Sequence, residues 1–185
     1  MKIAQQKRKE NIAEYLLYMW QVEDIIRACN RDIEVIDKNV ISQYQADEDT
    51  HAQMRDWWES LIKMMELENV KDKGHLQINK NVIIRLTDLH LELVKNEKYP
   101  DYGADYYRTL PFIVELRAKH GNTENAAGEL ETCFNALYGL LMLKLQGKEI
   151  SKETEVAMAQ ISHFLGLLAA YFVKYEAGEL ETNEL

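Results

Sequence analysis

Two apolar runs near the end of the chain, Cys133–Leu145 and Ile161–Val173, constrain its fold more than any other feature. In both runs large apolar residues recur at the period of an α-helix, beside a stripe of small residues that includes Gly139 and Gly166. Glycine costs about 1 kcal/mol against alanine inside a helix, so we interpret the stripes as the close approach of two packed helices. The sequence therefore predicts a buried helical hairpin at the centre of the molecule.

The ends of both runs carry residues that are typical of helix termini. Asn122 or Thr123 can cap the start of the first helix, Gly147 suits its end, and Ser151 can cap the start of the second. Each run holds about 13 residues, fewer than the roughly 20 that a membrane span needs. We therefore expect a soluble hairpin and no contact with a membrane.

Composition and the remaining apolar patterns favour helices throughout. The chain has 185 residues but only 2 prolines and 8 glycines, too few for the many turns of a sandwich or barrel. Helical spacing also occurs over residues 4–29, 33–44, 49–67 and 78–96. We predict an all-α fold, a single-domain antiparallel bundle of six or seven helices over residues 1–178, with an acidic, frayed tail at 179–185.

One stretch lacks a clear helical pattern. Pro100 and Gly103 indicate a turn, and Pro111 is expected to start or kink the next helix. Tyrosines surround this turn, and we interpret them as large residues that seal one end of the bundle: Tyr99, Tyr102, Tyr106 and Tyr107.

Charge and cysteine content exclude several partners. The formal net charge of −9 makes general nucleic-acid binding unfavourable, because phosphate backbones are also negative. We interpret the basic residues at the start of the chain as a solvated helix terminus. Met1–Glu10 has no apolar segment of a secretory signal, and Cys29 and Cys133 lie far apart in apolar contexts. We expect a cytoplasmic protein with reduced cysteines.

The opening segment Lys7–Asp24 reads KRKENIAEYLLYMWQVED. It resembles the start of an uncharacterised bacterial family that is filed as a domain of unknown function, and the likeness extends over the whole chain. The resemblance implies a cytoplasmic bacterial protein, and it brings no catalytic residues with it.

The motifs of common catalytic and metal sites are missing from the sequence. There is no glycine-rich phosphate loop, no nucleophile elbow and no Cys-x-x-Cys. A di-iron site on a bundle needs two Glu-x-x-His pairs, and only Glu48-x-x-His51 is present. The sequence therefore predicts no catalytic residue, no metal and no cofactor, and it favours a protein that is not an enzyme.

Two polar residues fall on apolar helix faces, Glu23 and His90. A buried carboxylate needs a compensating neighbour, so a structural hydrogen bond inside the bundle is the favoured interpretation. The alternative is a ligand pocket with Glu23 and His90 as its polar contacts. Its aromatic lining would come from Tyr15, Trp20, Trp57 and Trp58. His163, by contrast, is expected to be solvated.

These observations favour one functional hypothesis over another. The hairpin helices are apolar over more than half their circumference, which predicts self-association, as a homodimer, or binding to a protein partner. The second hypothesis is a small-molecule-binding protein or enzyme with the pocket around Glu23 and His90. The sequence names no substrate, ligand or pathway.

Overall fold

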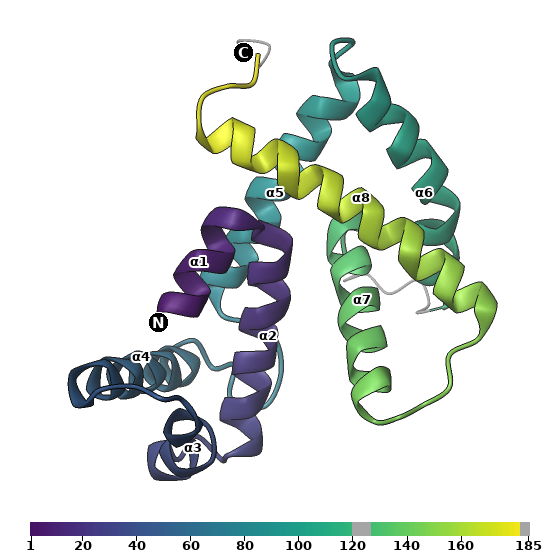
Figure 1. Ribbon diagram of the computed structural model, residues 1–185. Coiled ribbons are helices and arrows are strands. Elements are labelled where there is room, and N and C mark those ends of the chain that lie inside the picture. Colours follow the sequence, from purple (N-terminus) through teal and green to yellow (C-terminus); the bar gives the residue numbers. More distant parts are fainter. Residues whose placement is uncertain (120–126, 182–185) are drawn as a thin grey trace. The chain divides into compact units, whose positions relative to one another are not determined.

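The computed structural model describes residues 1–119 and 127–181, and within these ranges the protein is all-α (Figure 1). The described residues form no strand, so the predicted fold class is confirmed. The described residues form one short 3-10 helix, η1, and eight α-helices, in the order α1 Lys2–Glu10, α2 Ile12–Ala28, α3 Ile33–Asn39, η1 Ile41–Gln43, α4 Glu48–Leu67, α5 Gln77–Lys95, α6 Pro100–Lys119, α7 Glu129–Leu145 and α8 Lys152–Glu176.

The helix count differs slightly from the prediction, because the expected first helix is two helices. Asn11 separates α1 from α2. Its side-chain Oδ1 accepts a hydrogen bond from the N–H of Ala13 at 3.0 Å, in the manner of a residue that caps a new helix. Hydrophobic periodicity continues across this break, so the pattern alone does not reveal it.

The stretch around Pro100 is helical, which corrects the expected turn. Pro100 is the first residue of α6, a position where its missing N–H costs no hydrogen bond. Pro111 lies inside the same helix and neither starts nor ends it. From Tyr102 onward, the tyrosines that were expected to surround a turn at one end of the bundle therefore belong to a regular helix.

The chain divides into two compact units. Unit 1 comprises Met1–Glu10 and Glu14–Val82, and unit 2 comprises Asn11–Ala13 and the chain from Ile83 onward. The prediction of a single domain over 1–178 stays a prediction. Each unit is described below by its own contacts.

In unit 1, the loop between α4 and α5 is fastened to α2. The guanidinium of Arg27 donates hydrogen bonds to the carbonyls of Val70 and Gly74, and it pairs with Asp24 at 2.8 Å. These bonds fix the segment immediately before α5. The fully buried large side chains of this unit include Trp20, Trp58, Met19 and Met65.

In unit 2, α8 packs on α6 and α7. Its buried arc repeats at helical spacing and consists of Met158, Ile161, Phe164, Leu165, Leu168, Ala169 and Phe172. On α7 the buried residues are confined to the first turns, Leu130 to Phe134, whereas Leu143 and Leu145 near its end are 42% and 71% exposed. The second half of α7 is therefore not the buried core helix that its apolar run predicts.

The ends of the hairpin helices were largely predictable. Ser151 caps α8, since its hydroxyl accepts a hydrogen bond from the N–H of Thr154 at 3.2 Å. Gly147 follows α7 with φ +66°, a conformation that favours glycine. Both expectations are confirmed. Asn122 and Thr123, the expected caps of α7, lie outside the described residues, and Gly128 occupies the N-cap position instead.

The close-approach interpretation of the two glycines is wrong. A Cβ atom built on Gly139 or on Gly166 would meet no other atom within 4 Å. Both glycines are exposed, so their helix faces look into open space. A stripe of small residues shows which side of a helix lacks bulky side chains. Here no neighbouring atom lies within 4 Å of the Cβ position of either glycine on that side.

Hydrogen bonds hold the segment after α8 in place as far as Glu181. The hydroxyl of Tyr99 accepts a hydrogen bond from the N–H of Glu181 at 3.1 Å, and Asn96 donates its amide to the Glu181 carbonyl at 3.2 Å. Residues 182–185 of the expected acidic tail lie outside the described residues.

Candidate functional site

A buried carboxylate, Glu23 of α2, is the polar centre of unit 1. Its side chain is fully inaccessible, and both oxygens have partners. Oε1 accepts hydrogen bonds from the N–H of Leu76 at 2.9 Å and from the side-chain amide of Asn79 at 2.7 Å. Oε2 lies 2.6 Å from Nδ1 of His75. The expectation that Glu23 is compensated inside the protein is confirmed.

The position of Glu23 also explains where α5 begins. Its carboxylate binds the N–H of Leu76, directly before the first residue of α5, where backbone donors are unsatisfied and the helix dipole favours negative charge. The contact joins residues 53 positions apart in the sequence. Glu23 of α2 therefore caps the start of α5, although the two are far apart in the sequence.

His75 is a candidate site residue that the sequence patterns did not reveal. Its ring stacks on the indole of Trp20, with ring centres 4.1 Å apart and planes 12° from parallel. Its side chain is 24% exposed although its Nδ1 is held by a buried carboxylate. A carboxylate at one ring nitrogen fixes the orientation of the imidazole and leaves Nε2 as its second polar atom. The one signal in the sequence is the need of a buried glutamate for a partner near a helix start.

His90 of α5 forms a separate polar contact in the core of unit 2. Its Nδ1 lies 2.7 Å from the hydroxyl of Tyr102, and its ring meets those of Tyr106 and Phe164 edge to face. Burial lowers the pKa of His90 below its usual value, against a smaller opposite effect from Glu129. Burial also raises the pKa of the Tyr102 phenol. The contact is therefore a neutral hydrogen bond at neutral pH.

The thiol nearest to this region is not an activated nucleophile. Cys133 is fully buried, and burial raises its pKa to about 12. Nucleophilic cysteines need the opposite shift, which a nearby cation or helix start produces. The side chains of unit 2 around His90 are thus arranged as a packed core.

The six residues predicted for a shared pocket are distributed over both units. Glu23 and His90 belong to different units, and each has its partners within its own unit. Trp20 is buried against His75, and Trp58 is buried beside Trp57 with ring centres 5.4 Å apart. Tyr15 and Trp57 line one surface pocket of unit 1. A pocket with both Glu23 and His90 as polar contacts stays a prediction.

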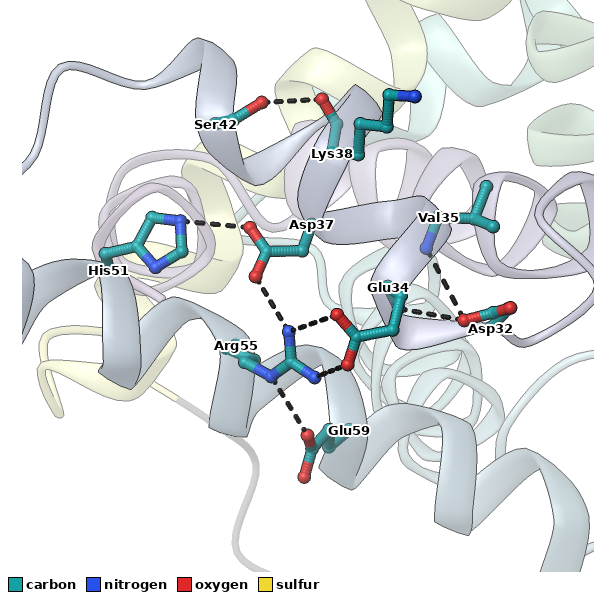
Figure 2. A network of polar contacts seen from close by, with 9 residues as sticks. All are labelled: Asp32, Glu34, Val35, Asp37, Lys38, Ser42, His51, Arg55 and Glu59. Atoms are coloured by element: carbon teal, nitrogen blue, oxygen red, sulfur yellow. Dashed lines mark hydrogen bonds and ion pairs between the residues drawn. The ribbon is translucent and has the colours of Figure 1, made fainter.

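A network of charges joins α3 to α4 in unit 1 (Figure 2). Arg55 of α4 pairs with Glu34, with Asp37 at 2.8 Å and with Glu59 at 3.4 Å. Hydrogen bonds to Glu34 and Asp37 raise the pKa of the Arg55 guanidinium. The imidazole of His51 lies 3.0 Å from Asp37.

This network includes His51 of the Glu48-x-x-His51 motif. Figure 2 shows the imidazole of His51 directed at Asp37, whose other oxygen pairs with Arg55, in an arrangement of polar contacts between α3 and α4. Across residues 1–119 and 127–181, no three acidic, histidine or cysteine side chains gather in a way that could hold a metal ion.

The most unusual surface of the described chain is one side of α8. We call it the α8 face and define it by Val156, Ala159, Ser162, Gly166, Ala170 and Val173, all exposed. The segment from Val156 to Val173 contains no Asp, Glu, Lys or Arg. Of the described helices, α8 alone is long and apolar enough to cross a membrane by length and composition, and 39% of its apolar window is buried.

A polar cluster meets the α8 face at His163, which lies within the exposed arc between Ala159 and Gly166. Asp105 of α6 is buried, and its Oδ1 accepts hydrogen bonds from Arg108 at 3.0 Å and from Gln160 at 3.2 Å. His163, on the outer side of α8, is 67% exposed and lies 3.7 Å from the same oxygen. The expectation of a solvated His163 is confirmed.

The described residues define an all-α protein in which Glu23, His90 and Asp105 are buried polar groups and one side of α8 is apolar and exposed. The chain belongs to the family described as a domain of unknown function, DUF4924, which matches residues 1–179. No curated protein and no solved structure matches the chain. The family resemblance of the opening segment is thereby confirmed over nearly the whole chain.

Proposed function

We propose that this protein is a non-enzymatic assembly protein of the bacterial cytoplasm that functions as a homodimer joined through the α8 face. The observation that carries the proposal is the exposure of a helix surface without any charged residue between Val156 and Val173. Exposed apolar surface of this kind typically marks an interaction site.

The composition of the α8 face favours a second copy of the same chain as its partner. Around a two-fold axis each residue meets residues of the same patch, so a charge there would face an identical charge. In a chain of net charge −9, the face keeps its carboxylates at the two ends, at Glu153 and Glu155 and at Glu176. Small residues, with Gly166 in the middle, let the backbones of two such helices approach closely.

The surroundings of the face suit the rim of an interface. Interfaces combine an apolar centre with a polar edge. His163 and the buried Asp105 supply polar groups beside the face, and Lys152 and Lys174 lie near the glutamates at its ends. With two α8 helices crossing antiparallel, each lysine-bearing end would lie near acidic residues of the other copy.

Localisation in the cytoplasm rests on separate support. Cys29 and Cys133 are both free, which is common in a reducing compartment. The bacterial source rests on the resemblance of the opening segment.

The test is the mass of the protein in solution, measured by light scattering after size exclusion. We expect a particle of twice the chain mass of 21.6 kDa at micromolar concentration. Gly166→Arg, which places a charge in the middle of the face, should yield the monomer. Asn135→Arg is the matched control, because Asn135 is exposed on α7 outside the face, and it should leave the dimer intact.

Two results would overturn the proposal. One is a wild-type mass of 21.6 kDa at every concentration, which would mean that the α8 face does not join two copies of the chain. The other is a dimer that Gly166→Arg leaves unchanged, which would assign the interface elsewhere.

A further inference from the structure

A surface pocket of about 180 Å³ lies within unit 1, between α1, α2, α4 and the first turn of α5. Its floor is apolar and buried, formed by Tyr15, Met19 and Leu61. Arg8 and Trp57 stand at its edge. All residues that line the pocket belong to unit 1, whereas the α8 face belongs to unit 2.

The size of the pocket restricts what it can hold. Pockets for drug-sized ligands run from about 300 to 1,000 Å³, so this one suits a smaller molecule. A single ring or a short branched chain with one polar group fits this space.

The aromatic walls favour a flat apolar group. Trp57 is half-buried, and its indole is held edge to face against the buried Trp58 with ring centres 5.4 Å apart. A fixed ring of this kind offers a stacking surface without a large loss of conformational entropy. Tyr15, almost fully buried, supplies a second ring at the floor.

Arg8 supplies the charge. Its guanidinium carbon lies 5.6 Å from the ring centre of Tyr15, and in the part of the chain that the structure describes it forms no ion pair with a carboxylate. The neighbouring Lys7, by contrast, is paired with Glu14 at 2.9 Å. A guanidinium over an apolar pocket matches a carboxylate, which it can bind through two parallel hydrogen bonds.

We propose that this pocket binds a small organic monocarboxylate whose ring or branched chain lies against Tyr15 and Trp57 and whose carboxylate pairs with Arg8. The apolar body is recognised by the floor, and the charge fixes its orientation at the edge.

The test uses phenylacetate and its neutral analogue 2-phenylacetamide as probes, titrated into the full chain by calorimetry and followed by tryptophan fluorescence. We expect phenylacetate to bind at one site per chain with a dissociation constant of about 1 mM or tighter, an ordinary affinity for so small a ligand. Arg8→Gln should weaken phenylacetate about tenfold, because it removes a charge-assisted hydrogen bond. The amide should bind the wild type about as weakly as phenylacetate binds this variant.

The controls separate the site from general effects on folding or charge. Lys9→Gln removes an exposed charge from the same helix outside the pocket and should leave affinity unchanged. Trp57→Phe should retain binding, and Trp57→Ala should lose it, with thermal melting used to show that each variant is folded. Gly166→Arg should not change binding, so failure of the dimer and failure of this site are distinguishable.

Three results would overturn the proposal. These are no saturable binding of phenylacetate, equal affinity for phenylacetate and its amide, or equal weakening by Arg8→Gln and Lys9→Gln.

Discussion

Glu23 in unit 1 and the α8 face in unit 2 depart in opposite ways from the usual division of apolar inside and polar outside. Glu23 is a charge in the interior, and the chain itself provides partners for both of its oxygens. The α8 face is an apolar surface on the outside, with the Cβ position of Gly166 open to at least 4 Å. The buried charge of Glu23 has partners within the described chain, whereas the Cβ position of Gly166 has no neighbour there within 4 Å.

This difference separates structural from functional features. A buried carboxylate with a full set of partners fixes the start of a helix and needs nothing further from outside. An exposed uncharged face costs solubility and gains nothing for the isolated chain. For this reason we assign the Glu23 cluster to folding and the α8 face to assembly.

The largest expected effect comes from removing the buried carboxylate. Glu23→Ala would leave His75, Asn79 and the Leu76 N–H without their acceptor, and the free energy of unfolding should fall by about 3–5 kcal/mol. Urea unfolding followed by circular dichroism measures it. Glu14→Ala on the same helix, which removes an exposed ion pair with Lys7, should change stability by no more than about 1 kcal/mol. Equal effects of the two variants would break the contrast on which our assignment rests.

A smaller effect is expected at the second buried polar centre, His90. Because burial lowers its pKa in the folded state, the unfolded chain binds this proton more readily, and stability should fall as pH drops below about 6.5. His90→Gln should make the decline in unfolding free energy between pH 7 and pH 5 shallower. Leu89→Ala, which destabilises the same helix by cavity formation but keeps the histidine, should retain the wild-type slope. Identical slopes in all three proteins would contradict a desolvated His90.

The smallest effect tests the open helix faces. Gly139→Ala should raise the free energy of unfolding by about 0.5–1 kcal/mol, because alanine is the better helix former and its Cβ meets no neighbour within 4 Å. Thermal or urea unfolding at low protein concentration measures the change. If Gly139→Ala instead lowers the free energy of unfolding by more than about 1 kcal/mol, the helices of the hairpin are closely packed at this glycine.

Features that depend on neighbouring residues were predictable from the sequence. The helical class follows from apolar spacing, and the caps at Ser151 and Gly147 follow from local hydrogen-bonding rules. The burial of Glu23 and His90 and the exposure of His163 follow from their places on helix faces. Each of these inferences uses only a few adjacent turns of one helix.

Features that depend on distant residues were not predictable in the same way. The contact of His75 with Glu23 spans 52 positions, so no local pattern announces it. The break at Asn11 and the helical start at Pro100 were missed because periodicity and proline signals each allow two outcomes. The glycine stripes were misassigned because periodicity shows which side of a helix is smooth but not what covers it.

Cysteine cross-linking across the α8 face tests the central claim most directly. Ser162→Cys, Gly166→Cys and Ala170→Cys are each introduced with Cys29→Ser, and the chains are mildly oxidised at micromolar concentration. A disulfide needs Cα atoms about 4.4–6.8 Å apart, so at least one of the three should form a covalent dimer much faster than the exposed control Asn135→Cys. If none of the three cross-links faster than that control, the α8 face does not join two copies of this chain.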